Sequence, residues 1–435
     1  MPQQTSSSAD NNPTNQTPAA QLAETVADWS LSRASAHALG APLVTIIGDG
    51  QLARMMHQAG IELGLTTRVL AGAADSSTAQ VTPDVVLGDY TNRDHVEEVS
   101  RGSDAVTFDH EHVPNEFLEA LIAEGINVQP QPKALVNAQD KLVMRKRMRE
   151  IGAPVPPFME ITSMDEIREF FDITGGNVCL KTRRGGYDGK GVWFPATADD
   201  AAELVADLLE QGLPLMAEKK VQLVRELSAM VARTPSGEVR TWPVVESVQE
   251  DGICVEAVAP APDTSASILT AAEELARVVV SELEVTGVLA VELFETVDEA
   301  GQPEIIVNEL AMRPHNTGHW TQDGCVTSRF EQHLRAVLDR PLGDTSPIGP
   351  TTVMANVLGA DNDPNMAMRR RMDEVWRRYP NAKIHMYGKE WRPRRKMGHV
   401  NMVRTEGQSV DELRTAAREA ANYLVTAQWT DGYTG

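Results

Sequence analysis

Two acidic residues, Glu292 and Glu309, stand on apolar runs, residues 287–294 and 305–310, that have the composition of β-strands. Residues 298–303 between them have turn composition, so a hairpin that closes symmetrically would pair residue 292 with residue 309. Like charges directly opposite each other on a sheet are destabilising by about 0.2–1 kcal/mol unless a cation lies between them. Carboxylates that act together with substrate phosphates are a common site for Mg²⁺. The pattern therefore favours a metal site, whereas a register one residue away would leave two solvated acids on opposite faces.

A glycine-rich loop, residues 182–191, joins two further predicted strands, residues 178–181 and 192–194, and contains four glycines and three cationic side chains. Glycine lets the backbone approach an anion closely, so that amides point at it while Lys and Arg neutralise its charge. We therefore predict a phosphate-binding loop, and the alternative is a flexible, charged surface hairpin. Lys181 favours the first interpretation, because an ammonium group at the end of an apolar strand needs a partner.

Gly48, Gly50 and Ala53 follow a predicted strand, residues 43–47, with the spacing of a dinucleotide-binding turn, and a helical stretch comes next. The acid that should close the following strand is missing, because residues 67–70 run into an Ala-Gly pair. The same turn can instead hold the phosphate of a nucleotide substrate at a helix N-terminus, or serve tight packing alone. We therefore expect a substrate phosphate or simple packing here rather than NAD.

Residues 313–320 follow Glu309 closely and combine hydrogen-bond donors with Gly and Pro, which suits a loop that orients a small oxyanion. A purely structural loop is the alternative. His315 and His319 do not share a helix face, which disfavours a zinc site. Residues 389–399 form a basic island in a chain of net charge −22 and are a candidate receptor for a phosphate ester.

These motifs, in this order, resemble the ATP-grasp superfamily and, within it, the family of N5-carboxyaminoimidazole ribonucleotide synthases of purine biosynthesis. The resemblance covers roughly residues 41–430 and is carried by residues 48–55, 185–191, 308–311, 315–321 and 395–399. Two residues depart from the family pattern, Ala53 in place of the commoner glycine and Met312 in place of proline. Neither departure removes a charge or a ligand.

The resemblance implies roles for individual residues. Those expected to bind ATP are Lys141, Lys181, Gly186, Tyr187, Asp188, Gly189, Lys190, Gly191, Val192, Glu218, Lys219, Lys220, Val221, Glu226, Gln249, Asn308 and Glu309. Mg²⁺, with Mn²⁺ as a substitute, would be held by Glu292 and Glu309. Catalysis would involve Tyr187, Lys190, Arg313 and His315, and the ribonucleotide would contact Gly50, Gln51, Lys389 and Arg395.

The implied reaction is the ATP- and bicarbonate-dependent carboxylation of 5-aminoimidazole ribonucleotide, through carboxyphosphate, with release of ADP and phosphate. A formate-dependent glycinamide ribonucleotide transformylase of the same superfamily is an alternative. From other classes, an NAD-dependent oxidoreductase or a catalytically inactive nucleotide-binding protein would also account for some of the motifs.

Composition limits the class of protein. The 435 residues include 62 Asp and Glu against 40 Lys and Arg, a balance that disfavours nucleic-acid binding. No apolar run approaches the ~18 residues of a membrane span, and no signal peptide opens the chain, so we expect a cytoplasmic enzyme without membrane contact. Three dispersed cysteines argue against a disulfide framework. The family resemblance implies small-molecule substrates and a homodimer.

The predicted fold class is α/β with ATP-grasp architecture. We expect a disordered extension over residues 1–40 and a Rossmann-like parallel α/β domain over residues 41–133. An ATP-grasp region would follow over residues 134–340, opening on a helix from 134 to 151 and including a small α+β lid over about 155–215. Residues 341–435 would complete the larger α+β domain.

Overall fold

The computed structural model describes residues 40–185, 190–298 and 300–434. The expected extension, residues 1–40, lies almost wholly outside the described residues, as do Gly186, Tyr187, Asp188 and Gly189 of the predicted phosphate loop. The elements below belong to residues 42–435, which group together by their internal contacts. No helix among the described residues is long and apolar enough to cross a membrane.

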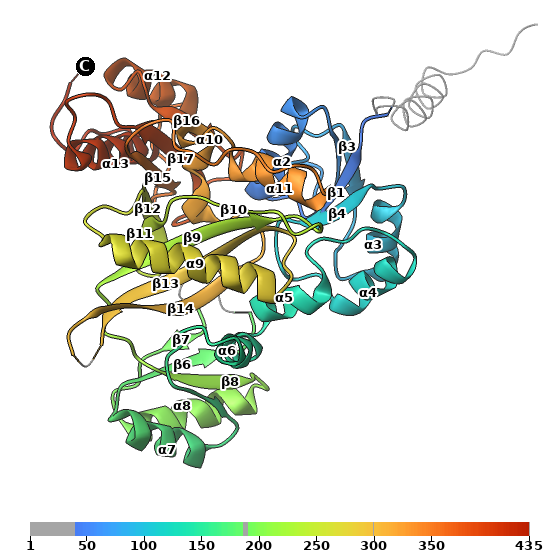
Figure 1. Cartoon of the computed structure of the whole chain (residues 1–435). Coiled ribbons are helices and arrows are strands. Elements are labelled where there is room, and N and C mark those ends of the chain that lie inside the picture. The colour runs from blue at the N-terminus through green and yellow to red at the C-terminus, as the bar shows by residue number, and fades with distance from the viewer. Residues whose placement is uncertain (1–39, 186–189, 299, 435) are drawn as a thin grey trace, which may run out of the picture. The chain divides into compact units, whose positions relative to one another are not determined.

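The first sheet is parallel, with the strand order β3-β2-β1-β4 (Figure 1). Its strands are β1 (Leu43–Ile47), β2 (Thr66–Ala71), β3 (Asp84–Leu87) and β4 (Ala105–Phe108), and its helices are α2 (Gln51–Glu62), α3 (Arg93–Ser100) and α4 (Asn115–Ala123). β1 and β4 are buried along their whole length, as expected for parallel strands covered on both faces. β2 lies on one side of β1 and β4 lies on the other, so the strand order reverses at β1. A crevice is expected at such a point, at the carboxyl ends of β1 and β4.

The single helix predicted over residues 134–151 is instead two helices, α5 (Pro132–Gln139) and α6 (Lys141–Glu150). Asp140 separates them with an extended backbone conformation, φ −132° and ψ 109°. Its side chain accepts hydrogen bonds from the amides of Leu142 and Val143 and so caps α6. The apolar periodicity continues across Asp140, which is why the pattern read as one helix.

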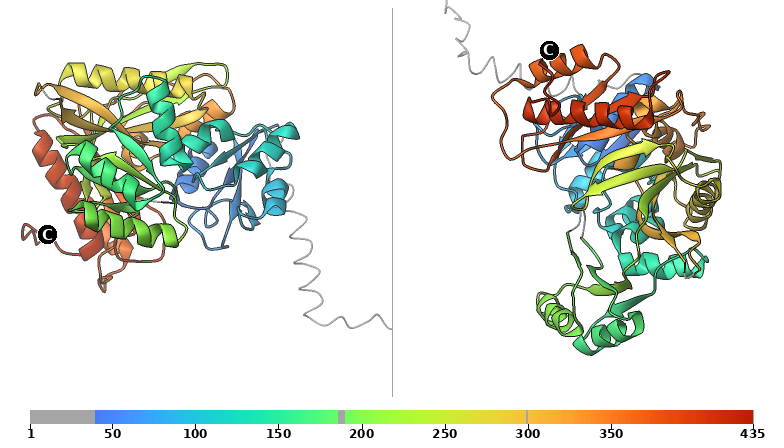
Figure 2. Two further views of the ribbon diagram at one scale, coloured as in Figure 1. Left: turned by 90° about the horizontal axis from the view of Figure 1, so that it is seen from below. Right: turned by 90° about the vertical axis from the view of Figure 1, so that its left-hand side faces the viewer.

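The lid has a four-stranded antiparallel sheet in the order β5-β8-β6-β7. Its strands are β5 (Phe158–Ile161), β6 (Val178–Thr182), β7 (Val192–Trp193) and β8 (Leu215–Lys219). Helices α7 (Met164–Thr174) and α8 (Ala198–Glu210) lie side by side against this sheet (Figures 1 and 2). The lid has its own apolar core, to which Ile167, Phe170 and Val205 contribute.

The large sheet is antiparallel and has the order β14-β13-β9-β11-β12-β15-β17-β16, with β10 paired to β9. Its strands are β9 (Arg225–Arg233), β10 (Val239–Thr241), β11 (Val245–Glu250), β12 (Ile253–Ala259), β13 (Gly287–Val297), β14 (Pro303–Ala311), β15 (Thr352–Leu358), β16 (Lys383–Met386) and β17 (Lys396–Val403). The remaining elements are α9 (Ala266–Glu282), the 3₁₀ turn η1 (Asn316–Gly318), α10 (Thr321–Gly324), α11 (Arg329–Val337), α12 (Met368–Arg378) and α13 (Val410–Thr426). Figure 1 shows α9 along the part of the sheet formed by β9, β13 and β14, whereas α12 and α13 lie near β15 to β17.

Candidate active site

Glu292 of β13 and Glu309 of β14 are directly paired across the hairpin, as the sequence predicted. The hairpin does not close symmetrically, however, because Leu293 pairs with Val307 and this offset continues to the turn. A β-bulge at Asn308 supplies the extra residue that brings residue 309 opposite residue 292. The predicted pairing of Glu292 with Glu309 is therefore correct, but it results from the bulge and not from a symmetric hairpin.

Each of these carboxylates has a cationic or hydrogen-bonding partner in the protein itself. His315 Nε2 lies 2.9 Å from Glu292 Oε1, and Lys141 Nζ lies 3.0 Å from Glu309 Oε1. Burial alone would raise the pKa of Glu292, but His315 and Arg313 outweigh it and lower that pKa below its ordinary value. The lowered pKa keeps Glu292 ionised, and the contacts with His315 and Lys141 offset the repulsion between the two acidic side chains.

A third carboxylate, that of Glu226, lies on the same face of the sheet. Ser228 pairs with Glu292 and Glu226 pairs with Phe294, so Glu226 and Glu292 are diagonal neighbours on adjacent strands. Burial and the charge of Glu292 raise the pKa of Glu226 to about 7, although a hydrogen bond from Gln249 opposes this shift. Gln249 also donates to Ser247 Oγ at 2.8 Å. Glu226 and Gln249, both expected at the nucleotide, therefore contact each other beside the carboxylate pair.

The donor set suits a hard cation that also binds phosphates. Among the described residues, no group of three or more His, Cys, Asp or Glu side chains is arranged to hold a metal on its own. Glu292 and Glu309 provide two carboxylates instead, and Mg²⁺ characteristically takes one or two carboxylates and completes its shell with water and substrate phosphates. The residues present fit Mg²⁺ in that mode, and Glu292 and Glu309 would hold it.

The loop after β14 is anchored by an acid that the sequence interpretation missed. Glu111 Oε2 accepts from Arg313 Nε at 2.8 Å, and Glu111 Oε1 accepts from the amide of Met312 at 3.1 Å. His315 Nδ1 lies 3.0 Å from Thr317 Oγ1, so both ring nitrogens of this histidine have partners. The guanidinium of Arg313 and the imidazole of His315 are thereby fixed next to the carboxylate pair.

In the lid, Lys181 has the buried partner that its sequence position required. Its Nζ lies 2.7 Å from Glu218 Oε2, and Arg145 Nε lies 2.7 Å from Glu218 Oε1. Burial would raise the pKa of Glu218, but Arg145 and Lys181 together lower it to about 2. The sequence interpretation missed Arg145, which lies on the strongly basic helix α6.

The segment expected to contact adenine, residues 218–221, consists of the last two residues of β8 and the two that follow it. Lys219 and Lys220 are exposed and Val221 is half-buried. The Lys220 amide already donates to Asn177 O at 2.9 Å, so a base would have to use other backbone groups of this segment.

The glycine-rich loop begins at the end of β6 and leads into β7, and these two strands are paired. Lys181 pairs with Val192, and the Gly191 carbonyl accepts from the Thr182 amide at 2.9 Å. Lys190 is exposed. The predicted grip of this loop on phosphate stays a prediction, because its central residues lie outside the described ranges.

The glycine turn after β1 contacts a carboxylate of the same chain. Asp109, which follows β4, accepts from the Gly50 amide at 2.7 Å, and a Cβ atom on Gly48 would lie 1.8 Å from Asp109 Oδ1. Burial raises the pKa of Asp109 to about 6. Any phosphate bound at the turn would compete with this acid, which weighs against the NAD alternative and equally against a substrate phosphate at these amides.

Three of the four residues expected at the ribonucleotide, Gly50, Gln51 and Lys389, lie together at this turn, and Arg395 is close enough to Lys389 to affect its pKa. Lys389 Nζ donates to Gln51 Oε1, which follows Gly50 directly. Burial and the neighbouring charge of Arg395 lower the pKa of Lys389 to about 8, while Asp109 acts in the opposite direction. The sequence offered one signal for Asp109 that was not used: like Lys181, it is a charge placed directly after an apolar strand.

Family models match three consecutive parts of the chain. They are described as a ribonucleotide synthetase preATP-grasp domain at residues 42–139, an ATP-grasp domain at residues 146–330, and a phosphoribosylaminoimidazole carboxylase C-terminal domain at residues 352–413. The fold and the site therefore define an ATP-grasp enzyme.

Full-length relatives specify the family. The chain is 58% identical over 401 residues to the N5-carboxyaminoimidazole ribonucleotide synthase of Corynebacterium ammoniagenes, covering 92% of this chain and 95% of that protein. It is 33% identical to the enzyme of the same name from Bacillus subtilis, covering 85% of this chain and 94% of that protein. The chain belongs to the N5-carboxyaminoimidazole ribonucleotide synthase family.

Solved structures agree with this assignment. An Aspergillus clavatus N5-carboxyaminoimidazole synthase, crystallised with ADP and 5-aminoimidazole ribonucleotide, superposes with a TM-score of 0.78 at 30% identity, covering 88% of this chain and 98% of that chain. The Thermus thermophilus enzyme superposes with a TM-score of 0.76 at 34% identity, covering 89% of this chain and 99% of that chain.

Proposed function

We propose how this chain performs the reaction of its family, the ATP-dependent carboxylation of 5-aminoimidazole ribonucleotide to N5-carboxyaminoimidazole ribonucleotide in purine biosynthesis. The enzyme is an ATP-dependent carbon–nitrogen ligase. The observation that carries the proposal is the pairing of Glu292 with Glu309 beside Arg313 and His315. The residues expected to hold a cation, the triphosphate and a small oxyanion are thus neighbours, which supports the proposal.

Two balanced steps account for the reaction. A bicarbonate oxygen attacks the γ-phosphorus of ATP and forms carboxyphosphate. The bond between that phosphorus and the bridging oxygen breaks, and ADP leaves with the electron pair of this bond. The amine of the ribonucleotide then attacks the carboxyl carbon of carboxyphosphate, the carbon–oxygen bond breaks, phosphate leaves, and the nitrogen loses a proton. Protein catalysis of phosphoryl transfer rests mostly on positioning and charge neutralisation, which matches a site rich in cations.

The residues divide between the three reactants. Lys141, Lys181 and the loop from Gly186 to Val192 would bind the triphosphate. The backbone from Glu218 to Val221 would bind the adenine, and Glu226 with Gln249 would bind the ribose of ATP. Arg313 and His315 would orient bicarbonate, with Tyr187 and Lys190 closing over it. Bound Mg²⁺ would neutralise phosphate charge at Glu292 and Glu309.

The N-terminal crevice would receive the ribonucleotide. Lys389 and Arg395 supply positive charge for its phosphate, while Gly50, Gln51 and the missed Asp109 supply polar contacts. Because burial holds the Asp109 pKa near 6, this acid is mostly ionised at neutral pH and suits hydroxyl or amine donors better than phosphate.

Release of ADP with different acceptors tests this function. We expect ADP only when aminoimidazole ribonucleotide and bicarbonate are both supplied, and none with glycinamide ribonucleotide and formate. NADH absorbance should stay constant throughout. Equal ADP release in buffer scrubbed of bicarbonate would overturn the carboxylation, and release with formate would support the transformylase instead.

We also propose that the enzyme acts in the cytoplasm as a homodimer. Its cysteines Cys179, Cys254 and Cys325 are all buried and unpaired, which is consistent with a reducing compartment. Light scattering at micromolar concentration would test the dimer, and a mass near 47.5 kDa would contradict it.

A further inference from the structure

Asp140, between α5 and α6, is a buried carboxylate to which the proposed reaction assigns no role. Its exposed fraction is 1%. Its Oδ1 atom accepts from the amides of Leu142 at 3.0 Å and Val143 at 3.2 Å. An N-cap alone needs no more than these bonds, and Ser or Asn would serve equally well.

The same carboxylate also binds two arginines of the lid. Arg183 Nη2 lies 2.8 Å and Arg184 Nε 3.1 Å from Oδ2, and Arg183 Nε donates to Oδ1 at 3.2 Å. These arginines directly precede Gly185 at the entrance of the glycine-rich loop. Burial would raise the pKa of Asp140, but the hydrogen bonds from Arg183 and from the Val143 amide help to lower it below its ordinary value. The carboxylate thus ties the start of α6 to one end of the loop.

Lys141 stands at this junction. It is the first residue of α6, its amide donates to Arg183 O at 2.9 Å, and its ammonium group lies 3.0 Å from Glu309 Oε1. One short segment therefore joins the lid arginines, through Asp140 and Lys141, to the carboxylate pair on the large sheet.

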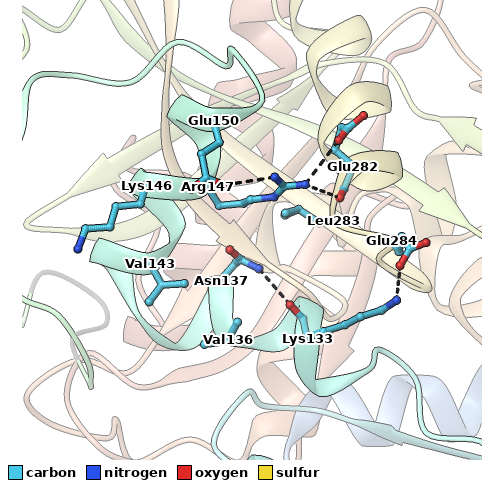
Figure 3. Close-up of a pocket in the computed structure, with 10 residues that line it drawn as sticks. All are labelled: Lys133, Val136, Asn137, Val143, Lys146, Arg147, Glu150, Glu282, Leu283 and Glu284. Carbon is cyan, nitrogen blue, oxygen red and sulfur yellow. Dashed lines mark hydrogen bonds and ion pairs between the residues drawn. The ribbon is translucent and has the colours of Figure 1, made fainter.

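Toward its C-terminal end, α6 contacts the large domain at the end of α9. A cavity of about 490 Å³ lies between α5, α6 and the end of α9. Arg147, one of the lining residues drawn in Figure 3, donates to the Glu282 carbonyl at 3.1 Å. Lys133 of α5 pairs with Glu284 on the same side. Since the acids and bases of this cavity are largely paired with each other, it gives no specific reason to expect a charged ligand. Its contacts connect α5 and α6 to the end of α9.

We propose that Asp140 is a positioning residue for ATP, which holds Lys141 and the entrance of the glycine-rich loop in the arrangement that receives the triphosphate. The inference rests on the proposed nucleotide site. Asp140 acts through Lys141, Arg183 and Arg184 and contacts no substrate itself. Preorganised cations bind phosphate more tightly because less ordering remains to be done on binding.

Asp140→Asn separates this role from helix capping. Asn caps helices about as well as Asp, but it loses the charge that holds the two arginines. We expect the KM and the Kd for ATP to rise about tenfold, while the KM for the ribonucleotide changes little. The melting temperature should fall only modestly, because both arginines that lose their partner are partly exposed to water. Asp199→Asn is the matched control, because it removes one lid carboxylate, paired with Arg168 at 3.3 Å, on the exposed surface.

A double-mutant cycle tests the path of the effect. If Asp140 acts through Arg184, adding Arg184→Gln to Asp140→Asn should raise the ATP Kd by less than the product of the separate effects. An unchanged ATP Kd in Asp140→Asn, with a raised Kd in Lys141→Met, would overturn the inference and leave the nucleotide site intact. Unchanged ATP binding in Lys141→Met would overturn the nucleotide site itself. A general loss of stability, with the KM values of all substrates raised by the same factor, would show that Asp140 only caps α6 and would overturn the inference.

Discussion

Glu292 and Glu309 lie opposite each other because one residue, Asn308, bulges out of the strand between Val307 and Glu309. With the register that holds near the turn, Glu292 would instead face Asn308. The bulge therefore creates the carboxylate pair, and bulges are common beside active sites, where they redirect a side chain. The contacts of Glu292 with His315 and of Glu309 with Lys141 offset the repulsion between the two acids.

Neutralising one member of this pair should remove activity and spare the fold. In Glu309→Gln, we expect turnover at saturating ATP and Mg²⁺ to fall at least about 100-fold, since a charge that helps to hold the cation is lost. The free energy of unfolding should change by less than about 1 kcal/mol, because a partly exposed ion pair is weak and a like-charge contact also disappears.

Glu304→Gln is the matched control for this prediction. Glu304 lies on the same strand but is exposed and pairs with Thr296, away from Glu292. Its turnover should be that of the wild type. Glu309→Gln with activity within a few-fold of the wild type would falsify the metal assignment.

The alkaline limb of the pH profile should report Lys389. Because burial and Arg395 lower the pKa of this lysine to about 8, its positive charge is lost progressively above that pH. We expect kcat/KM for the ribonucleotide, at saturating ATP, to fall above about pH 8 and to approach a tenfold loss per pH unit.

Lys389→Arg keeps a positive charge throughout this range, so its alkaline limb should move to higher pH even if its overall activity is lower. ADP can be quantified directly by chromatography, which avoids pH effects on coupling enzymes. The same limb in both proteins would show that another group titrates there.

Glu218 should stabilise the lid in a pH-dependent way. Glu218→Gln leaves Lys181 and Arg145 buried without their carboxylate, so we expect a loss of about 3–5 kcal/mol at pH 7. Burial opposes ionisation of Glu218, but its two cations lower its pKa from 4.5 to about 2. Its stabilisation is therefore fully present above about pH 4.5 and is lost as pH falls toward 2.

Calorimetric melting between pH 7 and pH 3.5 measures this effect. The gap between the melting temperatures of the wild type and Glu218→Gln should narrow at the acid end. Glu210→Gln, an exposed change on α8 of the same lid, should show no gap at any pH. A constant gap down to pH 3.5 would contradict the ion-pair explanation.

Local sequence patterns predicted much of the fold. Two apolar runs and the turn between them located the β13–β14 hairpin, and a charge at the end of an apolar strand predicted that Lys181 has a partner. The bulge at Asn308 could not be predicted in the same way. An extra residue in one strand shifts which side chains lie on which face, and the types of the individual residues do not show that shift. The order of motifs supplied the family, and with it expected roles that spacing alone could not assign.

The residues that sequence reasoning missed act through contacts distant in sequence. Asp109 is 59 residues from its partner Gly50, and Glu111 is 202 residues from Arg313. Asp140 had a local signal, since an Asp that precedes a helical run is a common N-cap. It was overlooked because the apolar periodicity runs through it from α5 into α6.

The transfer of oxygen from bicarbonate to phosphate tests the central claim most directly. If bicarbonate attacks the γ-phosphate at the site beside Glu292 and Glu309, then ¹⁸O-labelled bicarbonate should place one ¹⁸O atom in each inorganic phosphate formed in step with ADP. Mass spectrometry of the phosphate after a single turnover, in unlabelled water and before bicarbonate exchanges its oxygens, would measure this. Phosphate without label, formed together with carboxylated product, would show that ATP is not used to activate bicarbonate and would contradict the account.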